Sequence, residues 1–166
     1  SAAKQVKQLE FNAQEFGDTA ATNAAIAQAH TDGVVTSTTV AGNCTDIAGV
    51  CVALTKLSNL GIGLSLALIG GRPVSPAERV PALVTTDGLM RGRPSDFALD
   101  WWKQAISPEQ VQTELDAQIC RARDAGLQVD HLCTRGHLGF LPGIGQIVER
   151  LARRHQIAGI RTTSDP

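Results

Sequence analysis

The chain has 166 residues, of which 43% are hydrophobic and 19% charged, and its formal net charge is −1. That length fits a single domain, residues 1–166, with an interior large enough for a real hydrophobic core, and residues 1–5 are expected to be flexible or cloning-derived. Because the charge is near zero and no long basic run exists, we expect no nucleic-acid partner.

Strand and helix patterns alternate along the chain. Runs of β-branched residues mark strands, and apolar residues three and four apart mark helices. In chain order the sequence predicts a strand at 6–12, a helix at 18–31, a strand at 34–40, a helix at 45–57, a strand at 60–68, a long loop at 70–94, helices at 96–105 and 107–126, a strand at 129–133, a helix at 143–155 and a strand at 157–162. This βαβ order predicts an α/β fold with a parallel sheet and flanking helices.

Polar residues mark where several of these helices begin. Asp18 or Thr19 is suited to cap the first helix, and Thr45 or Asp46 the second, because their side-chain oxygens accept hydrogen bonds from free backbone N–H groups. Ser107 is the expected cap of the long helix at 107–126, with a proline at the first helical position.

The segment from 60 to 94 joins a strand to a long connection. Residues 60–68 are apolar nearly throughout, which is typical of a strand buried on both faces in a parallel sheet. The loop at 70–94 is longer than most connections inside a compact domain, and such loops usually serve as lids or binding loops.

The densest group of functional side chains lies in residues 130–142. Strand alternation places His131 and Cys133 on one face, and Arg135 and His137 follow in the loop at the carboxyl end of that strand. In α/β proteins ligands bind at this edge, so the segment predicts a site. The alternative is a polar connection without chemistry.

Membrane and export signals are missing from the sequence. No apolar run reaches the roughly 18 residues of a membrane span, and no secretory signal pattern opens the chain. The four cysteines contain no C-x-x-C pair, and a chain of this size needs no disulfides. We therefore expect reduced thiols, a cytoplasmic location and no membrane partner.

Five motifs occur in a fixed order. The chain reads N-A-Q-E-F-G at 12–17, D-G-V-V-T-S-T at 32–38, L-G-I-G-L-S-L at 60–66, G-R-P-V at 71–74 and H-L-C-T-R-G-H-L-G-F-L-P at 131–142. This order resembles the YdjC-like carbohydrate deacetylases of the chitooligosaccharide type, which include hopanoid-biosynthesis-associated members. Their motifs are N-A-D-D-F-G, D-G-x-x-T-S-T, L-G-x-G-L-H-L, G-R-P-L and H-L-D-S-H-x-H-x-H-x-L-P. Asn43 falls on the Asn of their V-N-G turn.

The resemblance implies a deformed, incomplete (β/α) barrel that removes N-acetyl groups from sugars with a divalent metal. Glu15, Ser65 and Arg135 occupy the positions of the family's three metal ligands, and Gln14 that of its catalytic base. Cys133 stands where the family has Asp.

These substitutions change the expected chemistry. A hydrolytic metal site needs about three protein ligands; Ser65 is a poor ligand and the Arg135 guanidinium repels a cation. The amide of Gln14 cannot act as a base. We therefore expect no metal, no cofactor and no deacetylase mechanism, unless Glu15, Cys133 and His137 form a rearranged metal site.

The preferred hypothesis is a metal-independent biosynthetic enzyme, of lyase, isomerase or cyclase type, acting on a small polar or acidic molecule in the former sugar pocket. Glu15 and His137 would be its acid/base pair, and Arg135 would hold an anionic or carbonyl oxygen. Cys133 is a subsidiary nucleophile candidate, if Arg135 and His137 lower its pKa. The predicted substrate-binding residues are Asn12, Gln14, Asn43, Ser65, Arg72 and His131.

Two other functions remain open. One is a non-catalytic pseudoenzyme that serves as a binding or scaffold protein, and the other is a metal-dependent N-acetyl-sugar deacetylase with a rearranged site. Family chains continue beyond the strand that matches 157–162, so a barrel ending there would leave a sheet edge open. Since closed twofold pairing is the commonest way to cover such an edge, we expect a homodimer.

Overall fold

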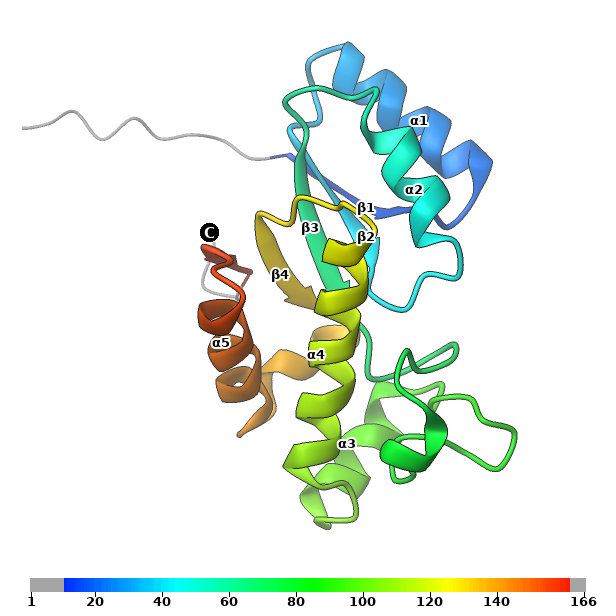
Figure 1. Ribbon diagram of the computed structural model, residues 1–166, viewed down its shortest axis with the longest axis vertical. Coiled ribbons are helices and arrows are strands. Elements are labelled where there is room, and N and C mark those ends of the chain that lie inside the picture. The colour runs from blue at the N-terminus through cyan, green and yellow to red at the C-terminus, as the bar shows by residue number, and fades with distance from the viewer. Residues whose placement is uncertain (1–10, 162–166) are drawn as a thin grey trace, which may run out of the picture.

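The computed structural model describes residues 11–161. Within that range five strands form one parallel sheet in the order β1-β2-β3-β4-β5 (Figure 1). They are β1 Asn12–Phe16, β2 Ser37–Ala41, β3 Gly61–Leu66, β4 His131–Thr134 and β5 Gly159–Ile160. Each strand lies beside its predecessor, as in the wall of a (β/α) barrel, and in this part of the chain the sheet is not closed. The predicted fold class is confirmed.

Five helices connect and cover these strands. They are α1 Ala20–Thr31, α2 Ile47–Leu54, α3 Pro94–Trp102, α4 Pro108–Asp124 and α5 Ile144–Arg154, with short 3-10 turns η1 Ala77–Arg79 and η2 Arg135–Phe140. The predicted caps are confirmed, since the side chains of Thr19, Asp46 and Ser107 accept hydrogen bonds from backbone N–H groups in the first turns of α1, α2 and α4. No helix of residues 11–161 is both long and apolar enough to cross a membrane.

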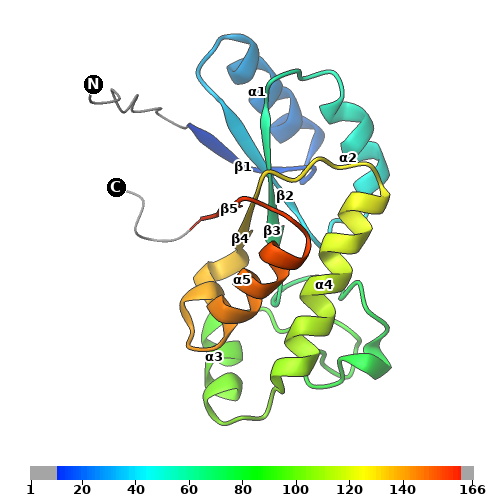
Figure 2. The same cartoon turned by 60° about the vertical axis from the view of Figure 1, so that its left-hand side comes forward.

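The two faces of the sheet differ in character. Val40, Leu64 and Leu132 are completely buried and share one core with the helix residues Ile119 and Ile147. Helices α1, α2 and α4 follow one another along this side of the sheet (Figure 2). The alternate positions of the same strands carry small or polar side chains and face the other way. One face therefore carries the packing, and the other is free to bind a ligand.

The first strand begins later than predicted. Residues 6–10 lie outside the described range, as do residues 1–5, and β1 starts at Asn12, where the prediction ended. Ala13 pairs with Thr38 and Phe16 with Val40, so β1 carries one residue more than β2 between these pairs. This β-bulge breaks the alternation on which a sequence prediction depends.

The third strand ends earlier than predicted, at Leu66 rather than residue 68. The side chain of Gln118, which is fully buried, replaces the missing strand partner: its Oε1 accepts from Ala67 N at 2.8 Å and its Nε2 donates to Ala67 O at 2.7 Å. The prediction that β3 is buried on both faces is also only partly right, because Ser65 faces a cavity.

The long loop is packed against the body of the protein. Val80, Leu83 and Met90 are buried, and the carboxylate of Glu114 on α4 accepts hydrogen bonds from the backbone N–H groups of residues 74 and 75 at 2.8 and 2.9 Å. The loop and α3 lie beyond the carboxyl ends of β3 and β4 (Figure 1). The segment thus forms a fixed wall at the edge where the sheet ends.

Candidate functional site

A cavity of about 370 Å³ opens at the carboxyl ends of the strands. All five strands contribute to it, directly or through the residues that follow them. Its lining residues are Gln14, Glu15, Thr39, Ala41, Ser65, Cys133, Thr134, Arg135, Gly136, His137, Phe140 and Arg161. This is the edge at which α/β proteins bind ligands.

Six of the ten predicted site residues meet in this cavity. They are Gln14, Glu15, Ser65, Cys133, Arg135 and His137. Their convergence follows from the parallel sheet, which brings the ends of successive strands to one edge. Ser65 and Cys133, for example, are register partners on β3 and β4.

Glu15 owes its position to the bulge in β1. Its φ of 71° is left-handed, which is uncommon for a residue with a side chain. Its N–H donates to the Thr39 hydroxyl at 3.4 Å, and its carbonyl accepts from Asp18 N at 3.1 Å. A bulge beside a site re-aims side chains toward it, so the sheet itself delivers this carboxylate.

His137 is held by a second strained segment. Gly136 and His137 have φ values of 65° and 57° within η2, and a left-handed residue that is not glycine costs of order 1 kcal/mol or more. The imidazole stacks on Phe140 with ring centroids 5.9 Å apart. The Thr134 hydroxyl accepts from Gly139 N at 2.8 Å and closes the turn. The closed turn and the stacking thus place the imidazole beside Phe140 at the cavity.

The charges at the cavity are unbalanced. Arg135 and Arg161 bring two guanidinium groups and Glu15 brings one carboxylate. None of these three side chains has an ion-pair or hydrogen-bond partner among residues 11–161. The cavity therefore offers two guanidinium groups to a ligand. A ligand that complements them carries negative charge.

Arg161 was missed because residue 161 fell inside the strand predicted at 157–162. In the structure β5 ends at Ile160, so Arg161 stands at its carboxyl end, the same edge as Arg135. The rule that ligands bind at the ends of strands would have found it, had the end of β5 been known.

Cys133 brings a partly buried thiol to the cavity. Burial raises the pKa of its thiol above the ordinary value, and the Ser65 hydroxyl and Arg161 lower it by less. Its Sγ lies 3.8 Å from Leu64 O. Arg135 and His137 are not among the groups that lower this pKa, and loss of water around the sulfur outweighs nearby charge.

Four predicted binding residues do not line this cavity. Asn12 and His131 are the first residues of β1 and β4 and so lie at the opposite ends of these strands. Arg72 lies in the long loop, beside Gly88. Asn43 donates from Nδ2 to Gly70 O at 2.8 Å and to Arg72 O at 3.2 Å, so it positions the start of the long loop.

Comparison with known proteins identifies the family. Residues 8–166, nearly the whole chain, match the YdjC-like protein family. The chain belongs to the YdjC-like family. The resemblance seen in the motifs is thereby confirmed.

Several YdjC-like relatives carry functional names. The carbohydrate deacetylase of Brevibacillus brevis is 34% identical over 149 residues, which are 90% of this chain and 57% of the relative. A carbohydrate deacetylase of Vibrio cholerae serotype O1 is 30% identical over 147 residues, 89% of this chain and 56% of the relative. This YdjC-like chain thus spans little more than half the length of the relatives that it matches.

A solved structure agrees with the fold. A crystal structure from Enterococcus faecalis V583, of a protein provisionally assigned to cellobiose-phosphate cleavage, superposes with a TM-score of 0.81 at 30% identity. The match covers 93% of this chain and 58% of that protein. The YdjC-like fold is therefore shared with an experimentally solved relative.

The cavity does not fit the divalent metal that the YdjC-like resemblance implies. Glu15, Ser65 and Arg135 do meet there, but their groups are a carboxylate, a hydroxyl and a guanidinium, and the last is a permanent cation. The rearranged set of Glu15, Cys133 and His137 is no substitute, because within residues 11–161 its ligand atoms do not all come within 4.8 Å of one another.

Proposed function

We propose that this YdjC-like chain binds a small acidic carbohydrate derivative in the cavity and acts on it by metal-independent acid/base chemistry. The observation that carries the proposal is the meeting of Arg135, Arg161, Glu15 and His137 in one cavity of ligand size. Two guanidinium groups select a carboxylate or phosphate, since their planar donors match its paired oxygens.

The names of the relatives support a carbohydrate ligand. Two are named carbohydrate deacetylases, and the solved relative is provisionally assigned to a phosphorylated disaccharide. A sugar phosphate combines the carbohydrate character of the family with the negative charge that Arg135 and Arg161 require. We therefore rank sugar phosphates and sugar acids first as ligands.

The acid/base step uses the two remaining functional groups. The Glu15 carboxylate accepts a proton from the substrate, and the His137 imidazole, held against Phe140, donates one to the group that leaves or gains electrons. Proton loss from one atom and gain at another are the elements of a lyase, isomerase or cyclase reaction. Arg135 holds the oxygen on which negative charge develops.

The experiment is a calorimetric binding comparison between cellobiose phosphate and cellobiose. We expect the phosphorylated sugar to bind at least tenfold more tightly, and Arg135→Gln or Arg161→Gln to remove most of that preference. Arg150→Gln, an exposed arginine of α5 that does not line the cavity, is the matched control. Equal binding of both sugars, or loss of preference in Arg150→Gln alone, would overturn the proposal.

A second candidate is a non-catalytic binding protein. It is favoured by Gln14, which lines the cavity where the family base would stand and cannot take a proton. In that case the phosphorylated sugar binds through the arginines but no product forms. Mass spectrometry of the bound ligand distinguishes an enzyme from a binding protein, since only an enzyme changes the covalent structure of the ligand.

A further inference from the structure

A second cluster of chemically active side chains lies outside the cavity, between α4 and α5. Asp116 and Cys120 are one helical turn apart on α4 and so share a face. His155 is the C-cap residue of α5. None of the three lines the cavity at the strand ends. The cluster therefore needs an explanation separate from the proposed function.

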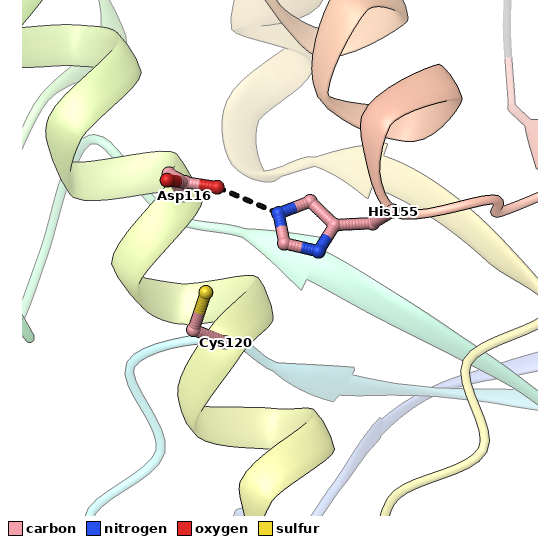
Figure 3. A group of neighbouring side chains, drawn as sticks. All are labelled: Asp116, Cys120 and His155. Carbon is pink, nitrogen blue, oxygen red and sulfur yellow. Dashed lines mark hydrogen bonds and ion pairs between the residues drawn. The ribbon is translucent and has the colours of Figure 1, made fainter.

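The three side chains converge on one point. The Asp116 Oδ1 and His155 Nε2 atoms are 2.6 Å apart. The Cys120 Sγ projects into the same space (Figure 3), and all three ligand atoms lie within 4.8 Å of one another. We propose that Asp116, Cys120 and His155 bind a divalent transition-metal ion, with zinc the best fit, and that this ion joins α4 to α5.

The donor set suits zinc. A thiolate, an imidazole and a carboxylate are its three protein ligand types, and a tetrahedral site with three of them keeps one position for water. The usual zinc–ligand bonds of roughly 2.0–2.3 Å put ligand atoms about 3.5 Å apart. The cluster reaches this spacing by side-chain rotation, because the metal replaces the proton shared by Asp116 and His155. A hollow of about 300 Å³ beside Asp116 and Cys120 leaves room for the water.

The surrounding hydrogen bonds leave His155 able to ligate. Arg123 donates to His155 O at 3.0 Å, and its contact with Nδ1 is longer, at 3.5 Å. Because Arg123 can only donate, this longer contact must give way when the ring proton moves from Nε2 to Nδ1 and Nε2 gives its lone pair to the metal. The ring is held in place, since its side chain is only 11% exposed.

Nearby charges act in both directions. Arg154 Nη1 lies 3.2 Å from Asp116 Oδ2. When a metal binds, Arg154 would either release this oxygen or share it with the metal. Burial raises the pKa of the Cys120 thiol, Asp116 and Asp124 raise it further, and Arg154 and Arg123 lower it by less. A bound cation reverses this effect, so metal binding releases the thiol proton. With two arginines close by, we expect affinity in the micromolar range, weaker than that of a closed structural zinc site.

The test is a titration of the full chain with Co²⁺, which reports a cysteine ligand through a thiolate-to-cobalt charge-transfer band. We expect a band that saturates at one equivalent, is displaced by zinc, and is lost in Cys120→Ser. Asp116→Asn and His155→Gln should each weaken binding at least tenfold. The control is Cys51→Ser, which removes a half-buried thiol of α2 and should leave the band unchanged.

Two results would overturn the proposal. One is the absence of a band at millimolar cobalt, and the other is a band that persists in Cys120→Ser. Circular dichroism distinguishes lost binding from lost folding in each variant. If His155→Gln disturbs the α4–α5 packing, the near-isosteric Asp116→Asn still decides the outcome. Zinc should also raise the thermal midpoint of the wild-type chain and not that of Cys120→Ser.

Discussion

The imidazole of His131 lies in the space that a side chain at Gly63 would need. The two residues are register partners on β4 and β3. A Cβ atom built on Gly63 would lie 2.2 Å from His131 Nε2 and 2.6 Å from Cε1, far inside contact distance. The glycine therefore lets the histidine ring cover β3.

We predict that Gly63→Ala lowers the free energy of unfolding by about 1–3 kcal/mol, because the methyl group and the ring cannot share this space. Urea denaturation measures the change. Gly92→Ala is the control and should change stability by less than about 0.5 kcal/mol, since nothing lies within 4 Å of its Cβ position. Adding His131→Ala should offset the effect of Gly63→Ala, and simple additivity of the two changes would show that the contact is not its cause.

Gln118 is predicted to be the most sensitive polar residue of α4. Gln118→Leu leaves both backbone groups of Ala67 without partners in the core and removes a 2.8 Å hydrogen bond to Glu114. Each unsatisfied group costs about 1–3 kcal/mol, so we expect a loss of about 3 kcal/mol or more in chemical denaturation. Gln112→Leu, half-buried on the same helix, should cost far less. Equal effects would show that helix propensity, not the buried network, decides stability.

Glu15 and His137 are predicted to carry the chemistry. Glu15→Gln keeps the shape of the side chain and removes its charge, so turnover of the substrate should fall about a hundredfold or more with little change in binding. His137→Ala should have a similar effect. Steady-state kinetics with Glu149→Gln, an exposed residue of α5, provide the baseline. Unchanged turnover in both site variants would exclude this pair.

Cys133 is predicted to be unreactive near neutral pH. Its pKa is raised by burial above the ordinary value of 9.0, so the folded state keeps the thiol proton where the unfolded chain loses it. The free energy of unfolding is therefore unaffected by this thiol at pH values below its ordinary pKa. It falls as the pH rises past that pKa. Alkylation followed by mass spectrometry should show little modification of Cys133 at about pH 7, and Cys133→Ser should keep turnover within about twofold. Rapid loss of activity on alkylation of Cys133 would restore it as a nucleophile.

Metal affinity at the cavity should be recoverable by substitution. In a Cys120→Ser background, which removes the site between α4 and α5, Ser65→His with Arg135→His supplies two imidazoles beside Glu15. We expect this variant to bind one equivalent of cobalt or zinc, because three ligands then line the cavity. Cys120→Ser alone should bind none there. Binding by that control would mean that the native residues already hold a metal.

Much of the fold could be predicted from periodicity, because strand and helix patterns alternate clearly and polar caps mark the helix starts. The errors fall where tertiary contacts override local pattern. The bulge displaced β1, and the side chain of Gln118 ended β3 by taking the place of a strand partner. Neither effect can be read from residues near in sequence.

The site was predictable to the extent that it depends on strand ends. Glu15, Arg135 and His137 meet as expected because parallel strands end at one edge. Asn12 and His131 were predicted to bind substrate, but each is the first residue of its strand. The length of the strand separates that residue from the carboxyl-end edge. The expected homodimer stays a prediction.

The side chains of each strand alternate between the core and the cavity, and this has a consequence for which residues can be substituted. Val40, Leu64 and Leu132 pack under the helices, while their sequence neighbours Thr39, Ser65 and Cys133 line the cavity. Replacing a cavity residue therefore removes little from the core. A combinatorial library confined to the cavity positions should yield many folded variants with new ligand preferences, and the same separation would let evolution alter the chemistry at residues 14, 65 and 135 while the barrel wall stays intact.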